Sequence, residues 1–185
     1  MMLFIKRQVK QIQQGGITVL ARKFKLLFGM TFKPILYIFA IPTVLIIRLI
    51  RPWLLVRLGS LMSGRIGHFA ANTELYLCER DAGINVPNQR HIDVFYMAFK
   101  PICNQQLAVM WQRLLSIWPS WILAPIKRVN RLIPGFESHE IDILYRFGGS
   151  WDIHNLLKRF PPHHQFTTEE DMRGEAGLRA MGIPI

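Results

Sequence analysis

Acidic residues are absent from the first part of this chain, and this constrains its fold more than any other feature. No Asp or Glu precedes Glu74, whereas eleven Lys or Arg residues fall between Lys6 and Arg65. From Glu74 onward twelve basic residues accompany twelve acidic ones, so the net charge of +11 belongs to the N-terminal part. Because this part is also rich in Leu, Ile and Phe, we expect it to bind anionic membrane lipid and not nucleic acid. A basic tail without a partner is the alternative, and the apolar content argues against it.

Two stretches within residues 1–51 favour membrane association. Residues 3–28 have the pattern of a basic amphipathic helix, interrupted by a pair of glycines, that lies among lipid headgroups. The uncharged stretch Ile35 to Ile47 is shorter than the roughly 20 apolar residues of a membrane-spanning helix. Because basic residues flank it on both sides, we expect a re-entrant or interfacial hairpin rather than a single tilted span or a buried helix. Residues 1–51 are therefore predicted to be a membrane-associating helical segment.

Residues 52–185 are predicted to form a Rossmann-like α/β domain. Residues 53–58 have the short apolar pattern of a buried strand, a loop of small residues follows up to Gly67, and residues 69–80 have helical spacing. Strand, glycine loop and helix are the opening unit of an α/β sheet. Further along, the sequence predicts a strand over 91–99, a helix over 104–117, either a strand or a short helix over 122–133, and a last helix capped by Thr168. The end of the chain has the pattern of a turn that leads into another strand, so we expect the domain to be truncated there.

The two cysteines, Cys78 and Cys103, have no neighbouring His or Cys at the spacing of a metal site or a disulfide framework. They are predicted to be reduced thiols in the core, and no metal site is expected.

The most informative string is the loop Ser63-Gly64-Arg65-Ile66-Gly67-His68. Gly64 and Gly67 let the backbone approach a ligand closely, and Arg65 is a bidentate donor for phosphate or carboxylate. His68 stands where the strand meets the helix, at the sheet edge at which open α/β folds bind ligands, and a neutral imidazole there can take a proton from a sugar hydroxyl. The string lacks the third glycine of a dinucleotide-binding fingerprint. A tight turn with a structural Arg and His is the alternative interpretation.

Farther along the chain, Asn72 and Glu74 are further candidates for binding a substrate, although Glu74 is equally well explained as a solvated side chain. His91 and Asp93 are expected at a solvent edge, and His163 with His164 in a surface loop that follows two prolines. Four tryptophans either stack on sugars or lie in the core or against a membrane; they are Trp111, Trp118, Trp121 and Trp151.

The run RIGHFAANTELYLCERDAG, followed by HIDVFYM, resembles the N-terminal half of a family of bacterial glycosyltransferases found with surface-polysaccharide genes. It is also similar to the R-x-G-D loop of heptosyltransferase-like enzymes. The resemblance covers about residues 53–182. It implies a GT-B-like enzyme of two Rossmann-like domains, in which this chain holds the acceptor and a missing C-terminal domain holds the nucleotide-sugar.

The resemblance also implies roles for individual residues. His68 stands where the heptosyltransferase-like pattern has an acidic residue, so it is the expected catalytic base. The substrate-binding residues would be Gly64, Arg65, Gly67, Asn72 and Glu74. The expected partners are anionic lipid and a glycan or lipid-linked acceptor, with a nucleotide-sugar as co-substrate, no cofactor, and a location at the cytoplasmic face of the bacterial inner membrane. A non-catalytic membrane-tethered scaffold for polysaccharide export, or an inactive fragment, is the alternative.

Overall fold

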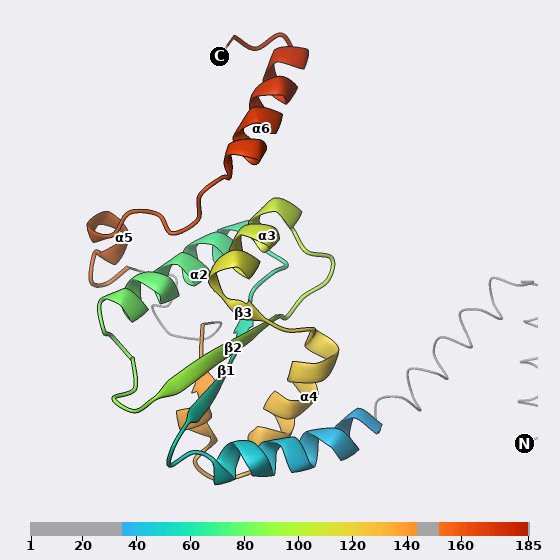
Figure 1. The fold of residues 1–185 in the computed structure, drawn as a ribbon, viewed down its shortest axis with the longest axis vertical. Coiled ribbons are helices and arrows are strands. Elements are labelled where there is room, and N and C mark those ends of the chain that lie inside the picture. The colour runs from blue at the N-terminus through green and yellow to red at the C-terminus, as the bar shows by residue number, and fades with distance from the viewer. Residues whose placement is uncertain (1–34, 144–151, 185) are drawn as a thin grey trace, which may run out of the picture.

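The computed structural model describes residues 35–143 and 152–184, and the prediction of an amphipathic helix over 3–28 lies outside these ranges. Its centre is a four-stranded parallel sheet with the strand order β3-β2-β1-β4 (Figure 1). The strands are β1 (Leu55–Leu61), β2 (His91–Met97), β3 (Ser116–Ile117) and β4 (Glu140–Ile141). β1 pairs with β2 along its whole length, from Leu55 opposite His91 to Leu61 opposite Met97. The predicted α/β class with a Rossmann-like parallel sheet is confirmed.

Helices cover both faces of this sheet because the right-handed connections to β2 and β3 run one way along the sheet and the connection to β4 runs the other way. The helices are α2 (Ile66–Asp81), α3 (Gln105–Leu114), α4 (Ser120–Asn130), the 3₁₀ helix η1 (Phe136–His139), α5 (Leu156–Arg159) and α6 (Thr168–Ala180). In addition, residues 35–49 form a helix ahead of β1. α2 and α3 lie on one face, whereas α4 and the helix over 35–49 lie on the other (Figure 1).

The main core lies between the sheet and the pair α2 and α3. Phe69, Phe95 and Trp111 are fully buried there together with Leu61 and Leu77. The indole N–H of Trp111 donates to the backbone carbonyl of Phe69 at 3.1 Å, which satisfies a buried donor and ties α3 to α2. This packing fixes where α2 begins relative to the end of β1.

A charged network on the same face holds β1, β2 and α2 together. The Arg57 guanidinium donates from Nε to Asp93 at 2.7 Å, and the Tyr76 hydroxyl donates to the same carboxylate at 2.5 Å. The expectation that Asp93 lies at a solvent edge is therefore wrong, because its side chain is only 11% exposed. The carboxylate is buried because both a cation and a hydroxyl compensate for its lost hydration.

The structure shifts several boundaries that the sequence predicts. β1 begins at Leu55 and continues through Gly59 and Ser60, which were expected in the loop. α2 begins at Ile66, so His68 lies inside its first turn. The segment over 122–133 that the sequence leaves open belongs to the helix α4 as far as Asn130. These shifts arise because parallel pairing with β2 extends β1 to Leu61, which periodicity within one segment does not reveal.

The last helix is capped one residue earlier than predicted. Thr167, not Thr168, is the N-cap of α6, and its side chain accepts from the Glu170 N–H while Glu170 accepts from the Thr167 N–H. This reciprocal pair is a capping box. Glu170 also accepts from Arg113, which attaches the start of α6 to α3.

The helix over residues 35–49 is apolar on two opposite faces. Ala40 and Val44 are buried against Val129 of α4, so this part of the chain packs on the sheet domain. The expected hairpin is not found in this stretch, because residues 35–49 form one continuous helix. Among the described residues, no helix has both the length and the apolar character needed to cross a membrane.

Candidate functional site

The turn after β1 and the connection after β2 meet at the carboxyl edge of the sheet. Ser63 joins them: its hydroxyl donates to the Phe99 carbonyl at 2.7 Å and accepts from the Phe99 N–H at 3.0 Å. Its carbonyl accepts from the Cys103 N–H at 2.9 Å. Ser63 is fully buried, and its hydroxyl makes two hydrogen bonds with the Phe99 backbone. It therefore gives the loop that carries the candidate residues a fixed position.

Arg65 and His68 stand at the start of α2, at this edge. Arg65 is the N-cap in extended conformation, and within the described part of the chain no side chain caps the helix and no acidic residue lies in its first turn. The Arg65 side chain is exposed and His68 is half-buried. Free N–H groups at a helix start attract anions, and an exposed guanidinium adds to that attraction. Arg65 and His68 thus lie three residues apart at the start of α2, at the sheet edge where the sequence predicts them.

The two candidate glycines differ in what their lack of a side chain allows. A Cβ at Gly64 would lie 3.0 Å from Cβ of Phe99, so Gly64 is needed for the close approach of the two connections. A Cβ at Gly67 would meet nothing within 4 Å. Packing therefore explains Gly64, whereas Gly67 leaves the backbone of the first helical turn open to solvent.

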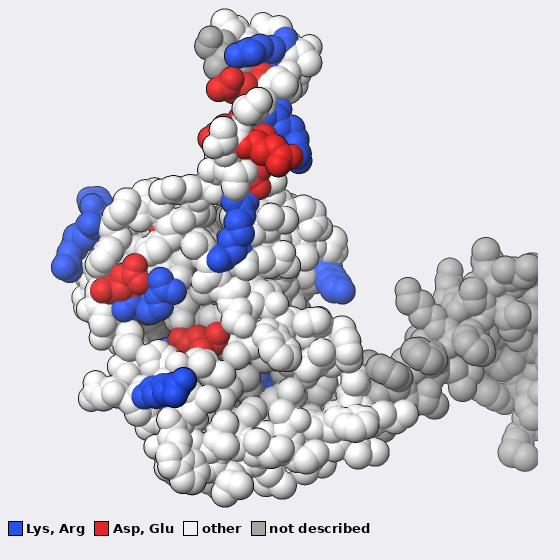
Figure 2. All heavy atoms as spheres, in the orientation of Figure 1, with Lys and Arg blue, Asp and Glu red and all other residues white. Residues whose placement is uncertain are grey.

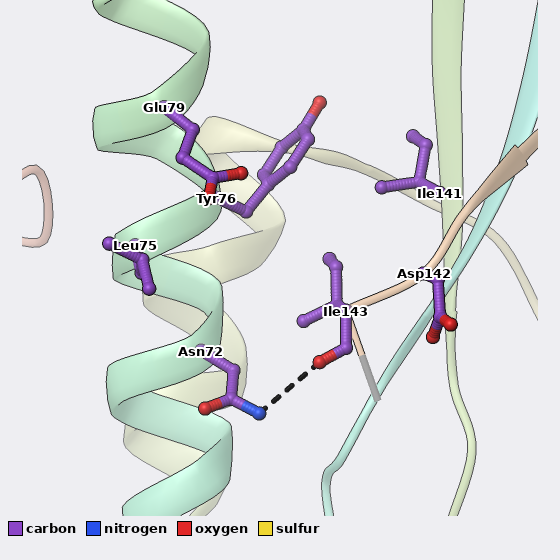
Figure 3. A pocket seen from close by; sticks show the side chains of 7 residues that line it. All are labelled: Asn72, Leu75, Tyr76, Glu79, Ile141, Asp142 and Ile143. Atoms are coloured by element: carbon purple, nitrogen blue, oxygen red, sulfur yellow. Dashed lines mark hydrogen bonds between the residues drawn. The ribbon is translucent and has the colours of Figure 1, made fainter. Parts of the chain in front are cut away.

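Asn72 lies one turn beyond His68 and connects it to the end of β4. Its amide Nδ2 donates to the Ile143 carbonyl at 3.3 Å and lies 3.5 Å from Nδ1 of His68, while its Oδ1 is buried and has no partner among the described residues. Asn72 and Ile143, but not His68, line a pocket between α2 and β4 (Figure 3). Figure 3 shows the Asn72 amide directed across this pocket toward Ile143.

The orientation of the Asn72 amide decides what His68 can do. As placed, Nδ2 faces Nδ1 of His68, so Nδ1 accepts and the neutral ring carries its hydrogen on Nε2. The ring is then a hydrogen-bond donor toward solvent. A turn of the amide by half a rotation is disfavoured, because it would place Oδ1 against the Ile143 carbonyl oxygen to which Nδ2 donates. For Nε2 of His68 to act as a base, the ring must carry its hydrogen on Nδ1 and give up the 3.5 Å contact with Nδ2 of Asn72.

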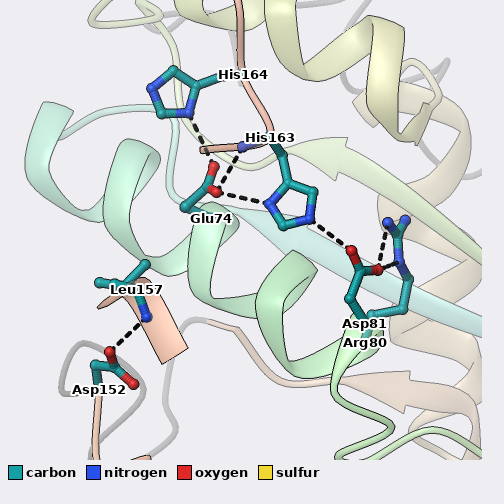
Figure 4. Close-up of polar contacts among 7 residues, drawn as sticks. All are labelled: Glu74, Arg80, Asp81, Asp152, Leu157, His163 and His164. Carbon is teal, nitrogen blue, oxygen red and sulfur yellow. Dashed lines mark hydrogen bonds and ion pairs between the residues drawn. The ribbon is translucent and has the colours of Figure 1, made fainter. Parts of the chain in front are cut away.

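Glu74 is separated from Arg65 and His68. One carboxylate oxygen accepts from the His163 backbone N–H at 2.9 Å and contacts Nδ1 of His163 at 2.7 Å. The other oxygen contacts Nδ1 of His164 at 2.9 Å (Figure 4). Burial raises the pKa of Glu74, but the hydrogen bonds from His163 and His164 outweigh burial, and the pKa lies below its usual value. Glu74 is thus neither a solvated side chain nor part of the Arg65 site.

The histidine pair is the feature that the sequence interpretation missed. His163 and His164 are half-buried against α2, not in a freely solvated loop. His163 also contacts Asp81 through Nε2 at 2.8 Å. Burial lowers the pKa of His163. The hydrogen bonds with Asp81 and Glu74 raise it by more than burial lowers it, so the pKa lies above its usual value. In the sequence, only the pair of histidines after two prolines indicates such a cluster. The carboxylates that His163 contacts are more than 80 residues away in sequence.

The tryptophans divide between core and surface. Trp111 is fully buried, whereas Trp118 and Trp121 are more than half exposed beside α4. Trp151 lies outside the described residues.

The chain was compared with protein-family models, with curated proteins and with solved structures, and none of the three comparisons found a significant match. The resemblance to bacterial glycosyltransferases therefore stays a prediction that rests on the residues quoted above.

Proposed function

We propose that this chain is the acceptor-side domain of a glycosyltransferase that works at a membrane surface, moving a sugar from a nucleotide-sugar to a glycan or lipid-linked acceptor. The observation that carries the proposal is the position of Arg65 and His68 in the uncapped first turn of α2, at the carboxyl edge of a parallel sheet. Open α/β sheets bind their ligands at this edge.

The two side chains suit different parts of such a reaction. Arg65 provides a planar, permanently charged donor for a phosphate or carboxylate of the acceptor. His68, which is half-buried at this edge, takes the proton from the attacking hydroxyl. The step forms a bond from the acceptor oxygen to the anomeric carbon and breaks the bond from that carbon to the nucleotide phosphate. The proton moves to Nε2 of His68, and the nucleotide leaves as the anion.

Membrane attachment is supported by the outward face of the helix over residues 35–49. Ile38, Ile41, Leu45 and Leu49 follow one another at helical spacing and are each at least half exposed, with Leu49 72% exposed. Other exposed apolar side chains flank them or follow the helix; these are Ile35, Phe39, Ile46 and Trp53. Figure 2 shows no charged side chain over the lower end of the molecule, where this helix runs in Figure 1. Several exposed apolar side chains on one uncharged side of the molecule mark an interaction with a membrane or a protein.

Charge favours a membrane as the partner of this surface. The sequence up to residue 73 contains eleven basic and no acidic residues, and anionic lipid attracts basic segments that flank an apolar surface. The helix would then lie along the lipid surface and hold the domain at the membrane.

The proposal is tested by transfer of a labelled sugar. The full-length protein, which includes the donor-binding domain that the resemblance implies, is incubated with a panel of radiolabelled nucleotide-sugars and with bacterial membranes as a source of acceptor, and the label in the lipid and glycan fractions is counted. We expect one donor to give transfer that His68→Ala abolishes. His91→Ala is the matched control, because His91 starts β2 at the opposite edge of the sheet. Membrane binding without transfer from any donor contradicts the proposal and favours the scaffold.

A further inference from the structure

We propose that Glu74, Cys78 and His163 form a binding site for a divalent transition metal ion, with zinc as the ion that best fits the ligand types. This site is separate from the Arg65 and His68 site and does not depend on the proposed transferase function. Its role would be structural: it would attach the chain segment before α6 to α2.

The ligand atoms are already close to one another. Glu74 and Cys78 are four residues apart in α2, a spacing that places two side chains on the same face of a helix. His163 approaches that face from the segment between α5 and α6. A carboxylate oxygen, the Cys78 sulfur and a ring nitrogen all lie within 4.8 Å of one another.

The groups around these ligands are those that orient metal ligands in proteins. A metal-bound His usually donates its other ring N–H to a carboxylate, and here Nε2 of His163 lies 2.8 Å from Oδ2 of Asp81. Ligating carboxylates are themselves hydrogen-bonded, and Nδ1 of His164 lies 2.9 Å from the second oxygen of Glu74. Figure 4 shows both contacts on either side of the Glu74 and His163 pair. Nδ1 of His163 is thereby directed at Glu74.

Chemistry and burial select the ion. Carboxylate, thiolate and imidazole together are a ligand set typical of zinc, and the two anionic ligands balance the charge of a divalent cation. Glu74 is 7% exposed and Cys78 is fully buried beside Leu75 and Leu156, so two of the three ligands are shielded from solvent, and a water molecule would complete a tetrahedral site. Burial raises the pKa of the Cys78 thiol to about 11, so the ion must displace the thiol proton when it binds.

Binding requires only a small rearrangement of side chains. Ligand atoms around a tetrahedral zinc ion are about 3.3–3.8 Å apart, as follows from its bond lengths. The contact between Glu74 and His163 is shorter than this, at 2.7 Å, because a proton lies between the two atoms. The ion takes the place of this proton, while the sulfur moves inward from its present separation of up to 4.8 Å.

Cobalt(II) tests the site without a change in any ligand. In Cys103→Ser, which removes an exposed thiol, Cys78 is the only remaining cysteine. We expect one equivalent of Co²⁺ to give a sulfur-to-cobalt charge-transfer band and tetrahedral visible bands, and one equivalent of Zn²⁺ to remove both. Co²⁺ that binds without the charge-transfer band, or the lack of any stoichiometric binding, would overturn the proposal.

Variants then identify the other ligands. We expect His163→Ala to weaken Zn²⁺ binding by more than about 100-fold and Asp81→Asn, which keeps the shape of the supporting group, by about 10–100-fold. His154→Ala is the control, because His154 is exposed in the same part of the chain. Circular dichroism confirms that each variant is folded. Equal Zn²⁺ affinity in His163→Ala and His154→Ala would rule out the assigned ligand set.

Discussion

The ring of Phe95 occupies the space that a side chain at Gly59 would need. A Cβ at Gly59 would lie 2.3 Å from two carbons of this ring, which is fully buried in the main core. Gly59 and Phe95 are paired residues of β1 and β2, so neither backbone can move away without breaking the sheet. Gly59 is thus required by packing of the core and not by a ligand.

The first prediction follows from this contact. Gly59→Ala should lower the free energy of unfolding by about 1–3 kcal/mol, because the new methyl group overpacks the core. Gly67→Ala is the matched control: its Cβ meets nothing within 4 Å, and in a helix Ala is about 0.5–1 kcal/mol more favourable than Gly. Urea unfolding of the two variants measures the difference. A Gly59→Ala variant as stable as the parent would show that Phe95 can move aside.

The second prediction concerns the exposed apolar face of the helix over 35–49. Replacing Ile38, Leu45 and Leu49 by Ser should reduce the salt-resistant binding to vesicles of phosphatidylcholine and phosphatidylglycerol by at least about tenfold, since each buried side chain contributes about 1.5–3 kcal/mol. High salt screens the basic residues but not this apolar contact. Vesicle flotation in high salt measures the binding that remains.

The control for this experiment carries the same substitutions on other exposed apolar residues. Ile153, Met172 and Met181 are each at least 66% exposed and belong to the segment with α5 and α6. Replacing them by Ser should leave flotation unchanged. If both triple variants float like the parent, the helix over 35–49 is not the membrane contact.

The third prediction separates Arg65 from His68 once donor and acceptor are identified. His68→Ala should lower kcat by about 10²–10⁴-fold, the usual contribution of a general base. Arg65→Ala should mainly raise KM, because Arg65 holds a charged group of the substrate in both ground and transition states. Steady-state kinetics on folded protein distinguishes the two effects. A kcat of His68→Ala within about threefold of the parent removes His68 from the mechanism.

The fourth prediction uses His139, whose ring has no exposed surface. Nδ1–H donates to the Val56 carbonyl at 2.8 Å, and Nε2 has no partner among the described residues. Burial lowers the pKa of His139, so the unfolded chain binds a proton there more readily than the folded chain. The stability due to the neutral ring is therefore complete above about pH 6.5 and decreases as the pH falls toward the folded pKa.

Urea unfolding at several pH values between about 5 and 7 tests this. The free energy of unfolding should fall with decreasing pH by up to about 1.4 kcal/mol per unit more in the parent than in His139→Gln, which cannot titrate. His163 has a raised pKa and acts in the opposite direction, but it is present in both proteins and cancels in the difference. Equal pH dependence in the two proteins would contradict the prediction.

The sequence by itself determined the features that depend on neighbouring residues. The strand, glycine loop and helix that place Arg65 and His68 at a sheet edge, the strand with apolar residues on both faces at 91–97, and the class of the fold could all be predicted. Alternation and helical spacing are local properties, because the backbone geometry of strands and helices fixes which side chains share a face. For a short apolar run this information is ambiguous, which is why the identity of α4 stayed open.

Only the tertiary structure decided which distant side chains meet. Glu74 and His163 are 89 residues apart in sequence, and Arg57 and Asp93 are 36 apart, so no local pattern could show that these charges are partners. From sequence alone, Glu74 and Asp93 are readily interpreted as solvated residues, because carboxylates are usually exposed. Their burial is favourable only because packing of the sheet and of the segment before α6 brings cations and hydrogen-bond donors to them, and that packing is a property of the whole core.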